Sequence, residues 1–398
     1  MKLKRILQGA LAALMSLGAA AQPAGVKIGF LTDMSSLFAD IDGKNGAVAV
    51  QMAIDDFGGK VLGKPIELLT MDHQNKPDLS AAKAREWFDV QGVSMILHGS
   101  GSGGTLAVAQ IAQEKKRVLF AIGAGAAAIT NEQCTPYTVH YAFDTVALSR
   151  GTAEAVVAKG GKSWFFLTAD YTFGHALEAD AAKVILARGG TVAGSVRHPL
   201  NASDLSSFLI KAQSSGAQIL GLATAGGDVL NAIRTAKDFG IDKKMQMAAL
   251  IFFISDVHGL GLKNAEGLYF TTSWDWNLNE ETRAFGRKFF AKTRRMPTDL
   301  QAADYSATMN YLKAVAATKT TDADTVMAYL KKTPLRDFYA SGVIRPDGRY
   351  EHNMYLMQVK SPAESTAPWD YTKLVKTMAG KDVFTRKEES RCSLWKDR

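Results

Sequence analysis

The feature that most constrains this fold is a regular alternation of short apolar runs with amphipathic helical stretches. Strand-like runs lie at 26–31, 66–71, 93–97 and 118–122, then at 164–167, 191–198, 219–223 and 245–250. Helical stretches separate them at 46–57, 78–90 and 104–115, then at 151–159, 174–188, 203–215 and 227–239. Strands that alternate with helices are typical of parallel sheets covered on both faces. A break over 131–149 divides the rhythm into two blocks, which predicts two successive doubly wound α/β lobes.

The last third of the chain follows a different pattern. Residues 280–332 are expected to be mainly helical, and 339–359 are expected to form a hairpin that turns at Pro346-Asp347-Gly348. The two blocks share a rhythm and no sequence repeat.

The first 21 residues have the pattern of an export signal. Lys2, Lys4 and Arg5 precede an apolar run at 6–17, and Ala19-Ala20-Ala21 matches an A-x-A cleavage site. The run is shorter than the roughly 20 apolar residues of a membrane-spanning helix. We therefore expect a cleaved signal peptide and a periplasmic protein; a retained membrane anchor is the alternative.

The charge of the mature chain argues against nucleic acid as a partner. Without the signal, the formal net charge falls from +8 to +5, with 44 basic against 39 acidic residues and no basic run. Nucleic-acid-binding proteins concentrate their positive charge on one face. A mildly basic, solvated surface is the simpler interpretation.

Cys134 and Cys392 are the only two cysteines. They do not have metal-binding or thioredoxin-type spacing, and an oxidising compartment favours a disulfide between them. Such a bond would tie the carboxyl-terminal tail to the loop after an early strand and stabilise the fold by about 4–5 kcal/mol. Two free thiols are the alternative.

The segment 99–104, Gly-Ser-Gly-Ser-Gly-Gly, satisfies G-x-G-x-x-G between a strand and a helix. A dinucleotide site is disfavoured because the motif follows the third strand and the next strand lacks an acidic residue for a ribose. An exported NAD(P)-dependent oxidoreductase is nevertheless kept as an alternative function of another class. The turn itself leaves backbone N–H groups free at a helix start, where a carboxylate is favoured. Ser102 and a second open turn at 123–126 would add to this cradle.

Patterns typical of enzymes are missing from the sequence. It contains no G-x-S-x-G nucleophile motif, and its seven histidines form no H-x-x-x-H pair for zinc. We therefore expect a protein that is not an enzyme and that needs no cofactor and no metal.

Five segments together resemble the leucine/isoleucine/valine-type periplasmic binding proteins, the solute receptors of ABC importers. They are 26–33 (VKIGFLTD), 72–78 (DHQNKPD), the Gly/Ser turn at 99–104, 170–174 (DYTFG) and 304–307 (DYSA). The resemblance implies two lobes joined by three hinge crossings, which close around a ligand. It implies one lobe from 25–144 plus 276–350 and another from 145–275 plus 351–398. An inner-membrane ABC permease would be the partner, and a monomer is expected.

The resemblance also implies site residues. The family's carboxylate-binding serine falls on Ser102, its backbone contacts near Ala124 and Gly125, and its packing ring on Tyr171 or Phe173. The wider set of expected ligand-binding residues adds Phe38, Ser100, Asp228, Phe252 and Trp274.

One departure from the family bears on the ligand. Amino-acid binders hold the α-ammonium with an acidic residue after the second lobe's fourth strand, but here 250–253 reads Leu-Ile-Phe-Phe. A buried ammonium without a carboxylate would cost several kcal/mol. We therefore expect a small carboxylate with an aromatic or apolar body and no α-amino group. An amino acid held by Asp228 or Asp40 is the alternative, and a ligand sensor for a signalling partner is another role for the same fold.

Overall fold

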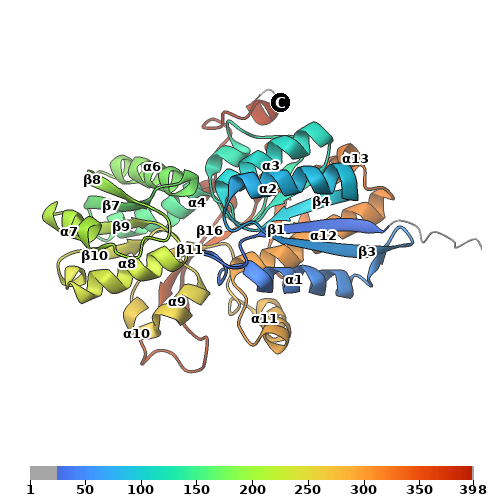
Figure 1. Cartoon of the computed structure of the whole chain (residues 1–398). Coiled ribbons are helices and arrows are strands. Elements are labelled where there is room, and N and C mark those ends of the chain that lie inside the picture. The colour runs from blue at the N-terminus through green and yellow to red at the C-terminus, as the bar shows by residue number, and fades with distance from the viewer. Residues whose placement is uncertain (1–24, 397–398) are drawn as a thin grey trace, which may run out of the picture.

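The structure, a computed structural model, describes residues 25–396 and contains the two parallel sheets that the alternation predicts (Figure 1). The first sheet has the order β2-β3-β1-β4-β5-β6 and the second the order β10-β9-β7-β8. The strands of the first are β1 (Val26–Thr32), β2 (Lys60–Val61), β3 (Lys64–Asp72), β4 (Val93–His98), β5 (Val118–Ala121) and β6 (Thr138–His140). Those of the second are β7 (Ser163–Ala169), β8 (Thr191–His198), β9 (Ile219–Ala223) and β10 (Gln246–Ala249). All pairings are parallel except β2 with β3. The expected signal peptide lies outside the described residues.

Helices from two distant parts of the sequence pack around the first sheet. The early ones are α1 (Gly43–Asp56), α2 (Pro77–Glu86) and α3 (Ser102–Lys115), and the late ones α11 (Glu280–Thr293), α12 (Asp299–Thr318) and α13 (Ala323–Lys332). The blue α1 and orange α12 lie against each other in Figure 1. This lobe is therefore completed by the helical region near the end of the chain.

The second lobe is built around its four-stranded sheet. Its helices are α4 (Thr145–Leu148), α5 (Glu154–Ala158), α6 (Thr172–Ala187), α7 (Ser206–Ser214), α8 (Gly227–Asp238), α9 (Ile254–Leu260) and α10 (Leu262–Ala265). The chain passes between the lobes three times, after β6, after a strand β11 (Tyr269–Thr272) and after a strand β14 (Tyr350–Glu351). No helix within 25–396 has both the length and the apolar character needed to cross a bilayer.

The carboxyl-terminal strands differ from the expected hairpin over 339–359. Only β13 (Ser341–Ile344) and β14 form that hairpin, and β13 also pairs with β12 (Leu335–Arg336). The expected second arm leaves it: β15 (Met354–Val359) instead pairs antiparallel with β11 and with β16 (Thr372–Met378). The partner β11 lies more than 80 residues before β15, so local turn chemistry does not reveal this pairing, whereas β16 follows β15 after a loop of 12 residues.

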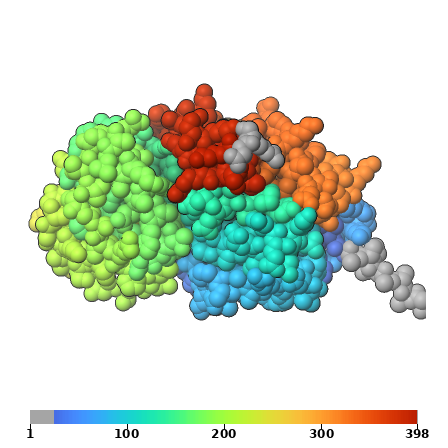
Figure 2. Space-filling model, turned by 90° about the horizontal axis from the view of Figure 1, so that it is seen from above, coloured from blue at the N-terminus to red at the C-terminus, as the bar shows by residue number. Residues whose placement is uncertain are grey.

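A disulfide holds the carboxyl-terminal tail in place. Cys134 and Cys392 are bonded, which confirms the pairing expected from the sequence. Arg150, near the first crossing between the lobes, donates to the carbonyl of Phe384 at 2.7 Å and pairs with Glu389 at 2.7 Å. Figure 2 shows this tail, in red, over the junction between the green and cyan parts of the molecule.

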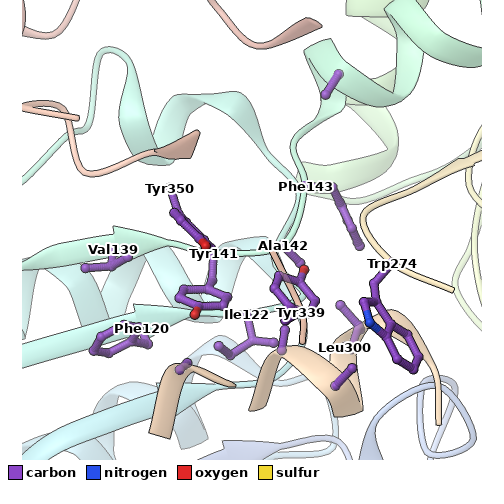
Figure 3. Close-up of a cluster of buried hydrophobic side chains, with 14 of the residues drawn as sticks. Phe120, Ile122, Val139, Tyr141, Ala142, Phe143, Trp274, Leu300, Tyr339 and Tyr350 are labelled. Atoms are coloured by element: carbon purple, nitrogen blue, oxygen red, sulfur yellow. The ribbon is translucent and has the colours of Figure 1, made fainter. Parts of the chain in front are cut away.

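The largest apolar core runs from the first lobe through the junction into the second, where it includes residues of β7 and α6 such as Trp164, Phe166 and Leu177. Figure 3 shows part of it, from Phe120 and Tyr141 to Trp274 and Leu300. Leu300 lies in the first turn of α12 and is 2 % exposed. The start of α12 therefore packs into this core at the junction between the two lobes.

Candidate ligand-binding site

A cavity with about 350 Å³ of empty space lies where the carboxyl ends of strands from both sheets meet. The first lobe lines it with Phe38, Ile41, Ser100, Gly101, Ser102, Gly123 and Leu300. The second lobe lines it with Tyr171, Phe173, Ala225, Ile251 and Phe253. In open α/β sheets this edge is where ligands bind. Only about 30 Å³ of this space is open to the centre of a water-sized group, so the cavity is narrow in this form of the protein.

Two serines supply the polar groups of the first-lobe wall. The Oγ of Ser102, the first residue of α3, accepts the N–H of Ala126 at 3.1 Å, which leaves its own proton free to be donated. The Oγ of Ser100 accepts the N–H of Asp33 at 3.3 Å. Both serines are buried, so a ligand oxygen would meet them away from bulk water.

Helix N-termini from both lobes converge on the cavity. The helices α3, α6, α8, α9 and α12 each begin within two residues of a lining residue. Three of these helices, α3, α6 and α8, are long and start after glycine-containing or strand-end turns. None of the three has a side-chain hydrogen bond at its N-cap. Free N–H groups and the positive ends of several helix dipoles make this space favourable for an anion.

Aromatic rings form much of the remaining wall. Phe38 and Tyr171 face each other across the lobes with ring centroids 6.2 Å apart, and Tyr171 lies 6.0 Å from Phe173. Phe253 packs 6.2 Å from Phe143. The lining therefore combines an anion-favouring corner with a flat apolar surface.

The two lobes touch directly at the rim of the cavity. The N–H of Gly227 donates to the carbonyl of Leu37 at 3.3 Å. Gly226 has φ +62°, and a Cβ there would lie 2.4 Å from the Leu37 oxygen. Only glycine allows the two backbones to approach this closely, and the structure is therefore in a closed conformation.

The structure brings five of the expected site residues into this lining: Phe38, Ser100, Ser102, Tyr171 and Phe173. Ala124 and Gly125 are placed just behind it. The carbonyl of Ala124 is bonded to His140 Nε2 at 2.5 Å, and a Cβ on Gly125 would lie 2.4 Å from the Phe173 ring. A side chain at position 125 would therefore collide with the Phe173 ring, so glycine is needed here for packing.

The structure places Phe252 away from the cavity, in contrast to the expectation. Its ring is 1 % exposed in the core of the second lobe, 6.1 Å from Phe270. The neighbours Ile251 and Phe253 line the cavity instead. The expected loop does reach the cavity, but through the neighbours of Phe252, because the direction of each side chain after a strand end depends on packing.

Two other expected residues also lie outside the main lining. Asp228 accepts the N–H of Asn201 at 3.1 Å, and burial raises the pKa of its carboxyl. Trp274 lines a smaller cavity beyond Phe253. Sequence reasoning also missed Ile41, Ala225 and Leu300, which carry no signal beyond being apolar residues near element ends.

The main cavity offers no charged side chain to a ligand. All its lining residues are apolar, hydroxylic or glycine. Nor does any group of three or more His, Cys, Asp or Glu within 25–396 have an arrangement that could hold a metal ion. A ligand in this cavity would therefore meet hydroxyls, backbone N–H groups and rings.

Comparisons with known proteins agree with this architecture. Residues 25–365 match the family described as periplasmic binding protein. A periplasmic binding protein from Burkholderia mallei is 59 % identical, with a TM-score of 0.93, over 94 % of this chain and 99 % of that one. A branched chain amino acid ABC transporter periplasmic ligand-binding protein from Burkholderia xenovorans is 38 % identical, with a TM-score of 0.82, over 93 % and 99 %. A Leu/Ile/Val-binding protein homolog from Brucella melitensis is 26 % identical over 74 % of this chain and 75 % of its own length.

Proposed function

The chain belongs to the periplasmic binding protein family, of the leucine/isoleucine/valine-binding type, and from this premise we propose that it captures a small aromatic or apolar carboxylate for import. It is a ligand-binding component of the kind that serves ABC transporters, and its family implies a periplasmic location and a membrane permease as partner. We further propose that it acts as a monomer, without a cofactor and without chemistry on its ligand.

The single observation that carries the ligand class is the uncharged lining beneath several helix N-termini. A carboxylate would accept from Ser102 and from free N–H groups at the start of α3. An α-ammonium would be desolvated against Phe253 and Ile251 with no lining carboxylate, at a cost of several kcal/mol. Phe38, Tyr171 and Phe173 instead offer faces on which a ring packs with offset or edge geometry.

Binding is proposed to be coupled to closure of the lobes. Phe38 of the first lobe and Tyr171 of the second meet over the cavity, and Gly227 bonds across to Leu37. A ligand that contacts both walls binds the closed form more tightly than the open form. The difference between these two binding free energies shifts the protein toward the closed form. A permease that recognises surfaces of both lobes would then distinguish loaded from empty protein. The units expected to move are 25–144 with 276–350 and 145–275 with 351–398.

A second candidate is a branched-chain amino acid, because two similar proteins are named for such ligands. A thermal-shift screen separates the two candidates. We expect benzoate-type and phenylpropanoid-type acids to raise the melting temperature and leucine to leave it unchanged. A response to leucine together with none to aromatic acids would reverse the choice of ligand.

The G-x-G-x-x-G turn and a sensing role are tested separately. Equilibrium dialysis with NAD(P) should show no binding at micromolar concentration, since tight nucleotide binding would favour an oxidoreductase. Neighbouring genes for a permease would support import, whereas genes for a membrane kinase would support sensing.

A further inference from the structure

A second, smaller cavity lies directly beyond Phe253, the residue whose side chain lines both spaces. It has about 260 Å³ of empty space, and its walls include Phe270, Trp274 and Trp276. Asp275 and Asp299 also line it. Asp299 is next in sequence to Leu300 of the main cavity, and Figure 3 shows Leu300 near Trp274. The two cavities are therefore neighbours along one wall.

Asp299 has one carboxylate oxygen with partners and one without. Its Oδ2 accepts from Ser273 Oγ at 2.8 Å, from the Ser273 N–H at 3.3 Å and from Thr272 Oγ1 at 2.9 Å. Its Oδ1 is buried and has no hydrogen-bond partner among the described residues, and the residue is 4 % exposed. An unsatisfied buried acceptor costs about 1–3 kcal/mol, and more when charged.

The other polar groups of the small cavity are already used. Asp275 accepts from the Asn277 N–H at 2.8 Å and from Thr372 Oγ1 at 2.8 Å. The indole N–H groups of Trp274 and Trp276 donate away from it, to the carbonyls of Phe338 and Trp369. Asp299 is thus the lining residue with a free carboxylate oxygen, beside aromatic side chains and a space of about 10 Å³, enough for about one water-sized group.

We infer that this cavity is a distal subsite that takes a hydroxyl or amino group carried on the ligand's ring, with Asp299 Oδ1 as its acceptor. The inference rests on the proposed function, since the carboxylate would lie at Ser102 on the other side of Phe253. It narrows the ligand class to acids that bear a hydrogen-bond donor at the end away from the carboxylate. Because Phe253 belongs to both linings, the ligand would reach the subsite past this residue.

Calorimetry of the mature protein with matched acids tests this subsite. The probes are benzoate with its para-hydroxy, para-amino and para-methoxy derivatives, and 3-phenylpropanoate with its para-hydroxy derivative for a longer reach. Donor-bearing acids should bind at least about tenfold more tightly than the parent or methoxy acid of the same length. Equal affinities within both series would overturn the inference and leave the proposed function standing. If the parent acids do not bind either, the proposed function fails and the inference falls with it.

Asp299→Asn supplies a second readout. Its amide oxygen keeps the Ser273 donors and turns an NH₂ group toward the cavity, so the preference should reverse toward the methoxy acid. Asp337→Asn is the matched control: Asp337 accepts from Ser306 at 2.6 Å and lines neither cavity, so the hydroxy preference should persist. An unchanged preference in Asp299→Asn would overturn the assignment. Should that variant fail to fold, the matched acids with the unaltered protein still decide.

Discussion

At the scale of single residues, the proposed site relies on hydroxyl and backbone N–H donors that the fold already holds in position. Ser102 already accepts from Ala126, which fixes its Oγ and directs its proton elsewhere. Fixed donors lose little conformational freedom on binding, so more of each hydrogen bond appears as affinity. This is why we expect a small number of polar groups to suffice for an anion here.

Ser102→Ala should weaken binding of an aromatic acid by about 1–2 kcal/mol, because one hydrogen bond to a charged group is lost. Isothermal titration calorimetry measures the change. Ser149→Ala is the control, since Ser149 is equally buried but bonds to the Thr145 carbonyl outside the cavity. An unchanged dissociation constant for Ser102→Ala would remove this residue from the site.

Substitutions of Phe173 and Phe252 should separate an effect on ligand binding from an effect on folding stability. Phe173→Ala should cost about 2–3 kcal/mol of binding free energy, because its ring lines the cavity. Phe252→Ala should instead lower the free energy of unfolding by about 3–5 kcal/mol, since its ring lies in the core. Titration calorimetry and urea denaturation measure the two effects. The reverse assignment of effects would contradict the placement of these rings.

At the scale of elements, the start of α9 contains a buried acid. Asp256 accepts the N–H of Phe253 at 3.0 Å, and burial, with Asp40 and Asp299 nearby, raises the pKa of its carboxyl to about 8. The same carboxyl in the unfolded chain titrates near 4. Between these values the folded protein holds a proton that the unfolded chain has lost. The stability that this proton contributes is therefore present at low pH and is lost as the pH rises toward 8.

Asp256→Asn should remove this pH dependence, because the amide is neutral throughout. The free energy of unfolding of the unaltered protein should fall between pH 5 and 8 by up to about 1.4 kcal/mol per pH unit from this group. Denaturant titrations at several pH values give the slope for both proteins. Identical slopes would show that Asp256 titrates normally.

At the scale of the whole molecule, one covalent bond joins distant parts of the chain, and we propose that the two lobes close by a hinge motion. The Cys134–Cys392 bond joins residues 258 positions apart and fixes the tail over the junction of the lobes. Cross-links that close long loops restrict the unfolded chain most. The tail is thus part of the fold and must tolerate movement between the lobes.

Replacing both cysteines by serine should lower the free energy of unfolding by several kcal/mol, about 4–5 in the chain-entropy model. Guanidinium denaturation with and without reductant measures the effect. The unaltered protein should lose this stability on reduction, whereas the double variant should not respond to reductant. Equal stabilities of the two oxidised proteins would show that the bond contributes nothing.

Closure should be visible in solution. Small-angle scattering of ligand-free protein should give a larger radius of gyration than the same protein saturated with a tight-binding acid, because hinge closure brings the lobes together. Identical profiles with a confirmed ligand would contradict the hinge mechanism.

The sequence by itself determined the two parallel sheets, because the alternation of apolar runs with helices can be recognised in each short segment without knowing how the segments pack. It also predicted the disulfide, with two free thiols as the alternative, and the structure confirms the bond. The sequence located the polar turn at Ser100 and Ser102 as well. The tertiary structure decided which of Phe252 and Phe253 faces the cavity. Adjacent side chains after a strand end point in different directions, and only the packing of the lobe determines which of them is turned toward the core. It likewise decided the pairing of β15 with the distant β11 and the contact of Leu300 with the first-lobe turns. These contacts join segments that are far apart in the sequence, and neither segment alone indicates its partner.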